Sequence, residues 1–369
     1  MDQRNKILAH NLVNNSCRVA KGEHVLIVGT GADTFELVSE CVKEVYKAGG
    51  YPHTELKDRS VLRSQLLEVK EAQLEQMAEI DLFKIKKMDC YIAISGSYNS
   101  YELSDVPSEA MQLWDKYMDE ALRYRVDKTK WVILRYPNAS AAQSAKMSKE
   151  VFADYYYNVC CLDYAKMEKA MQPLKELMEK TDRVRIVSQG TDISFSIKGM
   201  PAVKCSGECN IPDGEIYTAP VKDSVNGVIS YNTQSMYSGT VFENIRFEFK
   251  NGKIVDASAN HTERINEILD SDEGARYVGE FSFGLNPYVT KPMLDTLFDE
   301  KISGSIHFTP GCAYEDCNNG NKSVVHWDLV LIQTEEYGGG EIYFDDVLIR
   351  KNGRFVLPEL ELLNPEALV

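Results

Sequence analysis

Residues 245–257 read IRFEFKNGKIVDA, and residues 346–357 read DVLIRKNGRFVL. In both segments, apolar and polar residues alternate on either side of an Asn-Gly pair. Asn-Gly favours a tight turn whose two central residues need positive φ angles, so each segment is predicted to form a β-hairpin. Strand-like runs at residues 183–189 and 192–198 extend the pattern. The chain after about residue 180 is therefore predicted to be mainly antiparallel β-structure, with one helix at residues 263–270.

The first 180 residues follow a different pattern, in which helical and strand-like segments alternate. The predicted segments, in chain order, are a helix at 3–21, a strand at 24–28, a helix at 34–48, strands at 90–95 and 131–136, and helices at 142–158 and 164–180. Alternation of this kind is typical of a parallel or mixed sheet with helices packed against it.

Together the two patterns predict two domains. An α/β N-terminal domain, a mixed sheet with helices, spans residues 1–180, and a β-rich α+β C-terminal domain spans residues 181–369. The length of 369 residues fits this division, because one domain usually contains about 100–200 residues. With 44% hydrophobic and 26% charged residues, the composition is that of a globular protein.

The net charge and the cysteines limit the partners and the compartment. A formal net charge of −15 repels phosphate backbones and anionic lipids, so neither nucleic acid nor a membrane is expected as a partner. The N-terminus lacks the apolar core of a signal peptide, and no stretch approaches the ~20 apolar residues of a membrane span. Nine cysteines at irregular spacing fit a reducing compartment, so a cytoplasmic location is expected.

Two kinds of short motif indicate sites only weakly. The pairs Cys205/Cys209 and Cys312/Cys317 have spacings close to those of structural zinc sites, but buried thiols are the favoured interpretation. Gly29-Thr30-Gly31 follows a strand, as in dinucleotide-binding folds, but Thr34 stands where the third glycine of that fingerprint belongs. A tight strand-to-helix turn is therefore favoured over a nucleotide site.

A histidine and an aspartate are predicted to lie side by side in the second domain. Residues 324–331 read VVHWDLVL, and the two-residue period of a strand places His326 and Asp328 on one face. Imidazole nitrogen and carboxylate oxygen together suit Zn, Mn or Co, but for this pair taken alone a hydrogen-bonded pair at a sheet edge is the favoured interpretation. His307 follows a short strand nearby and favours the metal interpretation. Beyond a Pro-Gly turn, Tyr314 carries a phenol that can donate a hydrogen bond to developing charge.

Two glutamates occupy suggestive positions. Glu215 follows a Pro-Asp-Gly turn and begins a strand, and Glu280 is an isolated acid in an aromatic and glycine-rich run. An acid among apolar neighbours either faces water or has a strong partner, because an unpaired buried carboxylate is costly. On spacing alone, the solvent-facing interpretation is favoured for each.

Four of these segments, taken in order, resemble the M29 family of metallo-aminopeptidases, also called the aminopeptidase T or thermophilic metalloprotease family. The matching words are PDGEIYTAP at 212–220, YVGEF at 277–281, HFTPGCAY at 307–314 and VHWD at 325–328. GTDISFSI at 190–197 and GGEIYFDDVLIRKNGRFV at 339–356 add to the likeness. The resemblance covers the whole chain and is specific from about residue 185 onward.

The resemblance implies a cluster of two divalent metal ions, with Zn, Co or Mn as candidates. The implied metal ligands are Glu215, Glu280, His307, His326 and Asp328. Tyr314 would donate to the oxyanion, and Glu215 or Glu280 would transfer a proton as a catalytic carboxylate. The connection between His307 and His326 is shorter than in the best-known members of the family. The resemblance therefore does not define the shape of the substrate pocket.

The implied function is an aminopeptidase that hydrolyses N-terminal residues from short peptides with a metal-activated water, in a chain that assembles as a homodimer. Three alternatives are considered. They are a non-catalytic metal-binding dimer that binds peptides, a metal-dependent amidase with another substrate class, and a nucleotide-dependent enzyme built on the turn at Gly29 and Gly31.

Overall fold

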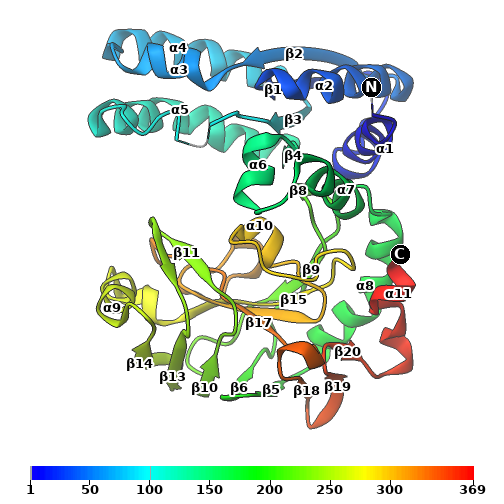
Figure 1. The fold of residues 1–369 in the computed structure, drawn as a ribbon, viewed down its shortest axis with the longest axis vertical. Helices are drawn as coiled ribbons and strands as arrows, with labels where there is room; N and C mark the ends of the chain where they lie inside the picture. Colours follow the sequence, from blue (N-terminus) through cyan, green and yellow to red (C-terminus); the bar gives the residue numbers. More distant parts are fainter. Residues whose placement is uncertain (1, 100) are drawn as a thin grey trace. The chain divides into compact units, whose positions relative to one another are not determined.

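The computed structural model describes residues 2–99 and 101–369, which form two compact units (Figure 1). Unit 1 contains the chain up to Leu162 together with Gly207–Pro212, and unit 2 contains Asp163–Ser206 and Asp213–Val369. Unit 1 is an α/β structure and unit 2 is rich in antiparallel β-structure, so the predicted fold class is confirmed. The domain boundary near residue 180 stays a prediction. Here the chain changes unit after Leu162, because helix α8 (Tyr164–Lys180) packs against strands of unit 2.

The sheet of unit 1 has the strand order β2-β1-β3-β4-β8. The strand bounds are β1 His24–Thr30, β2 Tyr51–Lys57, β3 Cys90–Ser95, β4 Lys130–Arg135 and β8 Cys209–Ile211. All of its strand pairs are parallel, and from β1 to β4 helical connections return the chain to the same end of the sheet each time. β8 returns from a distant part of the chain to cover the edge of β4, which no local pattern indicates.

Helices surround this sheet, and several differ from the prediction. Their bounds are α1 Arg4–His10, which continues as a π-helical segment Asn11–Ser16, α2 Phe35–Ala48, α3 Arg59–Leu66, α4 Glu71–Ile85, α5 Ser108–Lys128, α6 Ala139–Ser144 and α7 Lys149–Cys160. The first helix ends before the predicted residue 21. The single helix predicted at 142–158 is two helices, because the Ser148 hydroxyl accepts a hydrogen bond from the Val151 amide and caps a new helix.

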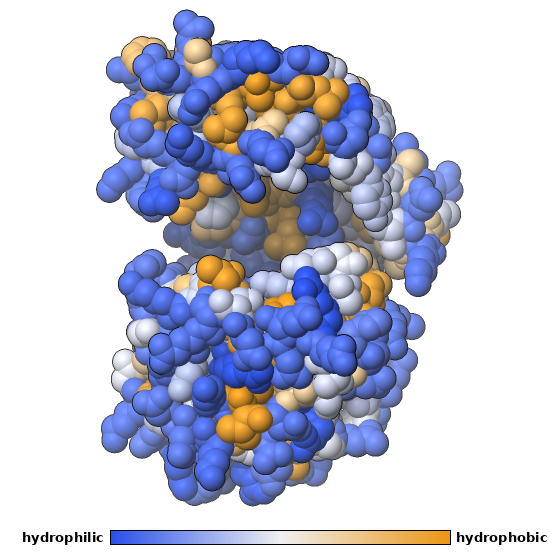
Figure 2. Space-filling model, turned by 90° about the vertical axis from the view of Figure 1, so that its left-hand side faces the viewer, coloured by the Kyte–Doolittle hydropathy of each residue, from blue (hydrophilic) through white to orange (hydrophobic). Residues whose placement is uncertain are grey.

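Helices α3, α4 and α5 were not recognised in the sequence, and their burial explains this. No residue of α5, all of which are described, is buried, so a strong apolar face is missing from the pattern. Figure 2 shows apolar side chains among the polar surface of unit 1. The exposed apolar residues of unit 1 include Ile80 and Phe83 of α4 and Leu122 of α5. Between the two helices lies a groove of about 480 Å³.

The glycine-containing turn after β1 is explained by close packing. Gly31 has a φ angle of +88°, and a Cβ atom there would lie 2.4 Å from the carbonyl oxygen of Gly96. Thr34, in the position of the missing third glycine, is buried and donates its hydroxyl to the carbonyl of Gly31. The glycine is therefore required by the neighbouring loop of β3, which favours the strand-to-helix turn over a nucleotide site.

Unit 2 contains two main sheets. The larger sheet has the order β14-β13-β10-β6-β5-β18-β19-β20, and the second sheet has the order β17-β16-β15-β9-β7. The bounds in the first are β5 Arg183–Ser188, β6 Thr191–Ser196, β10 Asn226–Ser230, β13 Arg246–Lys250, β14 Lys253–Ser258, β18 Gly340–Phe344, β19 Val347–Lys351 and β20 Arg354–Phe355. Those in the second are β7 Val203–Cys205, β9 Glu215–Thr218, β15 Val278–Gly284, β16 Ser305–Pro310 and β17 Val330–Ile332. A ribbon of β11 Ser235–Tyr237 and β12 Thr240–Phe242, and the helices α9 Thr262–Leu269, α10 Thr296–Asp299 and α11 Pro365–Leu368, complete unit 2.

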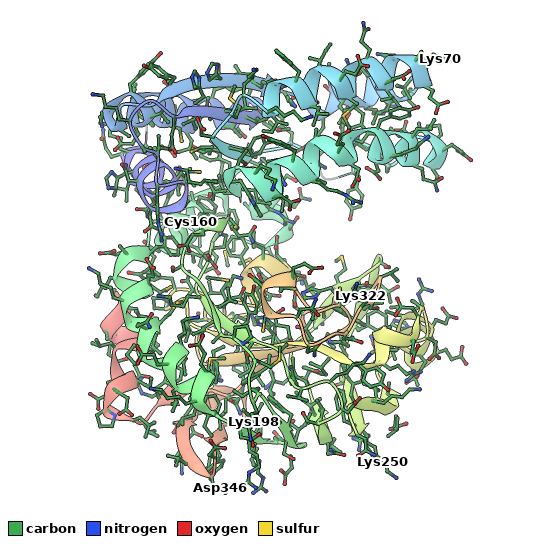
Figure 3. All side chains as sticks on the ribbon, turned by 180° about the vertical axis from the view of Figure 1, so that it is seen from behind. Lys70, Cys160, Lys198, Lys250, Lys322 and Asp346 are labelled. Carbon is green, nitrogen blue, oxygen red and sulfur yellow. The ribbon has the colours of Figure 1, made fainter. Side chains whose placement is uncertain are left out.

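Both predicted hairpins are confirmed. β13 pairs with β14 across Asn251-Gly252, and β19 pairs with β20 across Asn352-Gly353. Both asparagines have positive φ angles, as the turn type requires. In Figure 3, Lys250 at the end of β13 and Asp346 in the turn before β19 project from the same end of unit 2.

The core of unit 2 lies between its two sheets. Phe195 of β6 packs against Phe281 of β15 and Phe308 of β16, with ring centroids 5.1 and 5.0 Å apart. Strands present alternate residues to opposite faces. The face of β15 and β16 that does not carry these rings therefore presents Glu280 and His307, both buried.

Candidate metal centre

Three neighbouring strands and one extended segment bring the predicted ligands together. Glu215 begins β9, Glu280 lies in β15 and His307 lies in β16, and these strands are adjacent in the sheet. His326 and Asp328 come from the segment that precedes β17. The predicted strand at 324–331 is wrong in extent, because regular pairing begins only at Val330.

The segment before β17 nevertheless keeps a strand-like alternation. His326 forms a single antiparallel bridge with Gly311. Val325 and Trp327 are buried on one side, while the side chains of His326 and Asp328 reach the other side with 24% and 11% of their surface exposed. The expectation that both side chains share one face is therefore confirmed.

Glu280 lies at the centre of the cluster. Its Oε1 is 3.0 Å from Nε2 of His307, and its Oε2 is 3.4 Å from Nε2 of His326. Oε2 of Glu215 is 3.3 Å from the His307 nitrogen, and Oδ1 of Asp328 is 3.3 Å from the His326 nitrogen. The five residues thus form two groups of candidate ligands that share Glu280.

The cluster favours positive charge. Burial opposes protonation of His307, but Glu280 and Glu215 outweigh it and raise the pKa of this imidazole to about 10. Burial also opposes protonation of His326, yet its contacts with Asp328 and Glu280 raise the pKa to about 12. Burial raises the pKa of Asp328 and Glu280, but the histidines more than offset this and hold both pKa values below the usual range. The carboxylates therefore require cations beside them.

The donor atoms of this cluster fit a divalent metal ion. Nδ1 of His326 lies 2.8 Å from the carbonyl oxygen of Cys312. A carbonyl only accepts hydrogen bonds, so Nδ1 carries the proton and Nε2 is the nitrogen left for a metal. Among the described residues this buried Nε2 has no hydrogen-bond partner, although it faces the oxygens of Glu280 and Asp328. Two nitrogens and three carboxylates suit Zn, Co or Mn.

Tyr314 lies at the open side of the cluster. Its ring is 4.7 Å from that of His326 and 5.4 Å from that of Tyr217, and 45% of its surface is exposed. Burial and the charge of Glu280 raise the pKa of its phenol above the usual range, so it stays protonated and able to donate.

Several residues around the cluster were missed in the sequence. The ammonium of Lys301 is 2.7 Å from Oε1 of Glu215, and the hydroxyl of Thr309 donates to Oδ1 of Asp328 over 2.8 Å. The hydroxyl of Ser282 lies 3.3 Å from Oε2 of Glu215. The two-residue period of a strand could have identified Thr309 and Ser282. Thr309 lies on the same face of β16 as His307, and Ser282 lies on the same face of β15 as Glu280. Lys301 follows Asp299 and Glu300, and a run of charged residues usually lies at the solvent-exposed surface. No sequence signal therefore places Lys301 beside the cluster.

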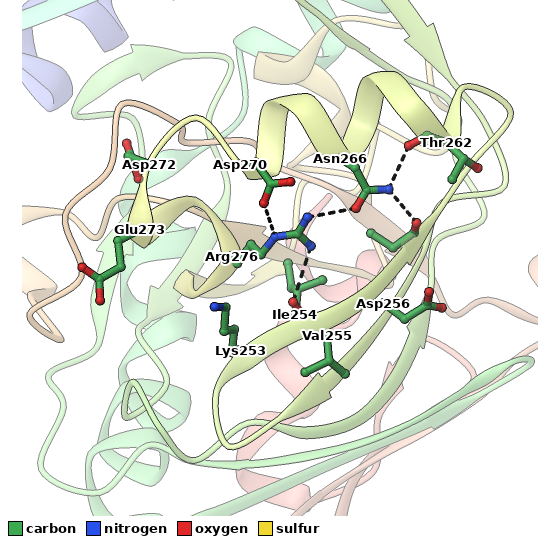
Figure 4. Close-up of a pocket in the computed structure, with 11 residues that line it drawn as sticks. Lys253, Ile254, Val255, Asp256, Thr262, Asn266, Asp270, Asp272, Glu273 and Arg276 are labelled. Carbon is green, nitrogen blue, oxygen red and sulfur yellow. Dashed lines mark hydrogen bonds and ion pairs between the residues drawn. The ribbon is translucent and has the colours of Figure 1, made fainter.

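The cysteine pairs and a second hollow are distinct from the set of five candidate ligands. Among the described residues, no group of candidate ligands contains two cysteines, which favours buried or half-buried thiols over a zinc site at Cys205/Cys209 or Cys312/Cys317. A hollow of about 660 Å³ between α9 and β14 shares no lining residue with the cluster. In it, Asp270 and Asn266 accept hydrogen bonds from Arg276 (Figure 4).

The family model of thermophilic metalloprotease (M29) matches residues 1–355. This chain belongs to the M29 family. Aminopeptidase AmpS of Bacillus subtilis (strain 168) is 27% identical to the M29 chain over 372 residues, which cover 89% of the chain and 88% of AmpS. The family is one of metallo-aminopeptidases, so the M29 chain is a hydrolase that uses divalent metal.

Solved structures share the fold. Wild-type AmpT from Thermus thermophilus matches the M29 chain with a TM-score of 0.76 at 20% identity, covering 96% of this chain and 99% of AmpT. 2,5-Dihydroxypyridine dioxygenase from Pseudomonas putida KT2440 matches with a TM-score of 0.61 at 14% identity, covering 97% and 98% of the two chains. The same fold therefore carries a second chemistry, and function has to be argued from the site. Among the described residues, no helix is both long and apolar enough to cross a bilayer.

Proposed function

We propose that this chain removes N-terminal residues from short peptides with two divalent metal ions. The observation that carries the proposal is the position of Glu280, whose two oxygens face two different imidazoles. Glu280 would contribute to both metal positions. Glu215 and His307 would complete one half-site, and His326 and Asp328 the other.

The chain's own residues orient this chemistry. When bound, a pair of divalent ions lowers the pKa of a shared water and supplies a hydroxide-like nucleophile at neutral pH. Tyr314 donates its phenolic proton in a hydrogen bond to the oxyanion that forms on the substrate carbonyl. Proton transfer to the leaving amine is assigned to a carboxylate oxygen of Glu215 or Glu280. The carbonyl of Cys312 and the hydroxyl of Thr309 hold His326 and Asp328 in place.

The proposal includes a homodimer in the cytoplasm. The homodimer rests on the family resemblance, and light scattering after size exclusion tests it. The compartment is supported by the cysteines, all nine of which are free thiols in the structure. A mass of one chain in solution would contradict the dimer without affecting the metal site.

The decisive experiment measures metal content together with hydrolysis of leucyl-7-amido-4-methylcoumarin and its N-acetylated form, before and after EDTA, with Zn, Co and Mn added back. We expect about two ions per chain and metal-restored cleavage of the free-amine substrate alone. Cleavage of both substrates would favour an amidase, and bound metal without cleavage would favour the peptide-binding dimer. Absence of bound metal would overturn the proposal.

Ligand variants test the shared role of Glu280. Glu280→Ala should lose both ions and all activity, because it contributes to both half-sites. Glu215→Ala and Asp328→Ala should each lose about one ion, and His326→Ala should lose metal and activity. Wild-type activity in Glu280→Ala or His326→Ala would contradict the ligand assignment.

A further inference from the structure

Lys301 is a fully buried cation on the outer side of Glu215. Only 1% of its side chain is exposed. Its ammonium lies 2.7 Å from Oε1 of Glu215, 2.5 Å from Oε1 of Glu300 and 3.8 Å from Oδ1 of Asp213. A lysine is almost never buried unless it is paired, so these three carboxylates define its position.

The backbone around Lys301 is also fixed relative to β9. Lys301 follows α10, and its carbonyl accepts a hydrogen bond from the Asn286 amide over 3.0 Å. The side chain of Asn286 donates to the carbonyl of Asp213 over 2.8 Å. Asn286 therefore ties the segment that carries Lys301 to the segment that leads into Glu215.

The two oxygens of Glu215 have different surroundings as a result. Oε1 accepts a hydrogen bond from the Lys301 ammonium. Oε2 faces Nε2 of His307 at 3.3 Å, with the Ser282 hydroxyl also at 3.3 Å. Glu280 differs, because each of its oxygens faces an imidazole. Only one oxygen of Glu215 is directed into the cluster.

We propose that Lys301 is a positioning residue that holds Oε1 of Glu215, so that Oε2 is the one oxygen of Glu215 that is offered to the ion on the His307 side. This inference rests on the proposed metal function. An outer contact of this kind fixes the rotamer of a ligand, and its loss typically costs about 10–100-fold in metal affinity. Lys301 thereby sets the affinity of one half-site and leaves the other unchanged.

The test uses the full chain and measures binding of Co²⁺ by calorimetry and by its visible absorption spectrum. Glu215→Ala and Asp328→Ala first assign each binding step to a half-site. Lys301→Met should then weaken the step assigned to Glu215 by about 10–100-fold and change its spectrum, with the Asp328 step unchanged. Lys301→Arg keeps the charge but shifts the donor, so an intermediate loss is expected. Lys322→Met removes an exposed lysine of the same unit and should match the wild type.

A second comparison separates positioning from folding. If Lys301→Met leaves buried acids unpaired and does not fold, the double variant Lys301→Met/Glu300→Gln is compared with Glu300→Gln, in which the contact of Lys301 with Glu215 remains. Equal affinities and spectra in that pair would overturn the positioning role. No bound Co²⁺ in the wild type would instead overturn the proposed function.

Discussion

Glu280 and Asp299 are both buried acids of unit 2, yet their surroundings give them opposite charge behaviour. Glu280 has two imidazoles beside it, and they hold its pKa low against the effect of burial. Burial raises the pKa of Asp299 to about 7, although its carboxylate accepts a hydrogen bond from the Met293 amide. At the scale of single residues, the partner decides whether a buried carboxylate is charged.

This difference predicts a pH-dependent effect for Asp299→Asn. The native pKa of about 7 lies above the ordinary aspartate value of 3.8, so the native state binds more protons between these two pH values and wild-type stability falls as pH rises through them. The variant lacks this penalty. Relative to the wild type, the free energy of unfolding of the variant in urea should increase between pH 5 and pH 8 by about 2–3 kcal/mol. A difference independent of pH would contradict this.

Tyr314→Phe should lose activity and retain metal. The ring of Tyr314 packs against His326, but the phenolic oxygen is assigned to the oxyanion and to no metal. Loss of one oxyanion donor typically costs about 10²–10³-fold in kcat. Metal content by elemental analysis should match the wild type, and its loss would show that the role assigned to Tyr314 is wrong.

At the scale of elements, the site depends on the approach of two segments. The turn after β16 runs beside the segment that carries His326 and Asp328, and the Cys312 amide donates to the carbonyl of Val325 over 2.7 Å. Gly311 lies at this contact with a φ angle of +108°, and a Cβ atom there would be 2.0 Å from the Val325 oxygen. The pair of ligands is held in place by this close backbone contact.

Gly311→Ala should therefore displace the segment and weaken metal binding. Gly320→Ala is the matched control, because Gly320 also has a positive φ angle, +84°, but nothing lies within 4 Å of the added Cβ. The control should cost about 1–2 kcal/mol of stability from backbone conformation alone and retain both ions. The variant at 311 should lose substantially more stability and part of its metal, measured by urea unfolding and elemental analysis. Equal effects of the two changes would contradict the packing argument.

At the scale of the whole molecule, all five candidate ligands belong to unit 2. A ligand that binds only the native state stabilises it, and removal of the ligand lowers the stability of the part that binds it. Hydrogen exchange by mass spectrometry with and without EDTA should therefore differ between the units. Peptides from β15, β16 and residues 325–332 should lose protection, while peptides from β1, β3 and β4 keep theirs. Equal loss in both units would contradict the assignment of the metals to unit 2.

Local sequence patterns predict much of the fold, and the family resemblance supplies the candidate ligands. Turn chemistry at Asn251-Gly252 and Asn352-Gly353 and the alternation of apolar residues are local properties, so the hairpins follow from them. The shared face of His326 and Asp328 follows from the same two-residue period. Four ordered motifs pointed to the M29 family, whose model matches the chain.

How these pieces meet depends on the tertiary packing. β8 joins the sheet of unit 1 from a distant part of the chain, and Lys301 reaches Glu215 from a loop 86 residues away. Glu280 lies at the centre of the cluster because strands β15 and β16 are neighbours and the segment that carries His326 and Asp328 lies beside them. Such contacts depend on long-range packing and on the burial of charge. A local sequence pattern contains no information about long-range packing or about the burial of charge. The sequence therefore does not distinguish the buried Lys301 from a solvent-exposed lysine.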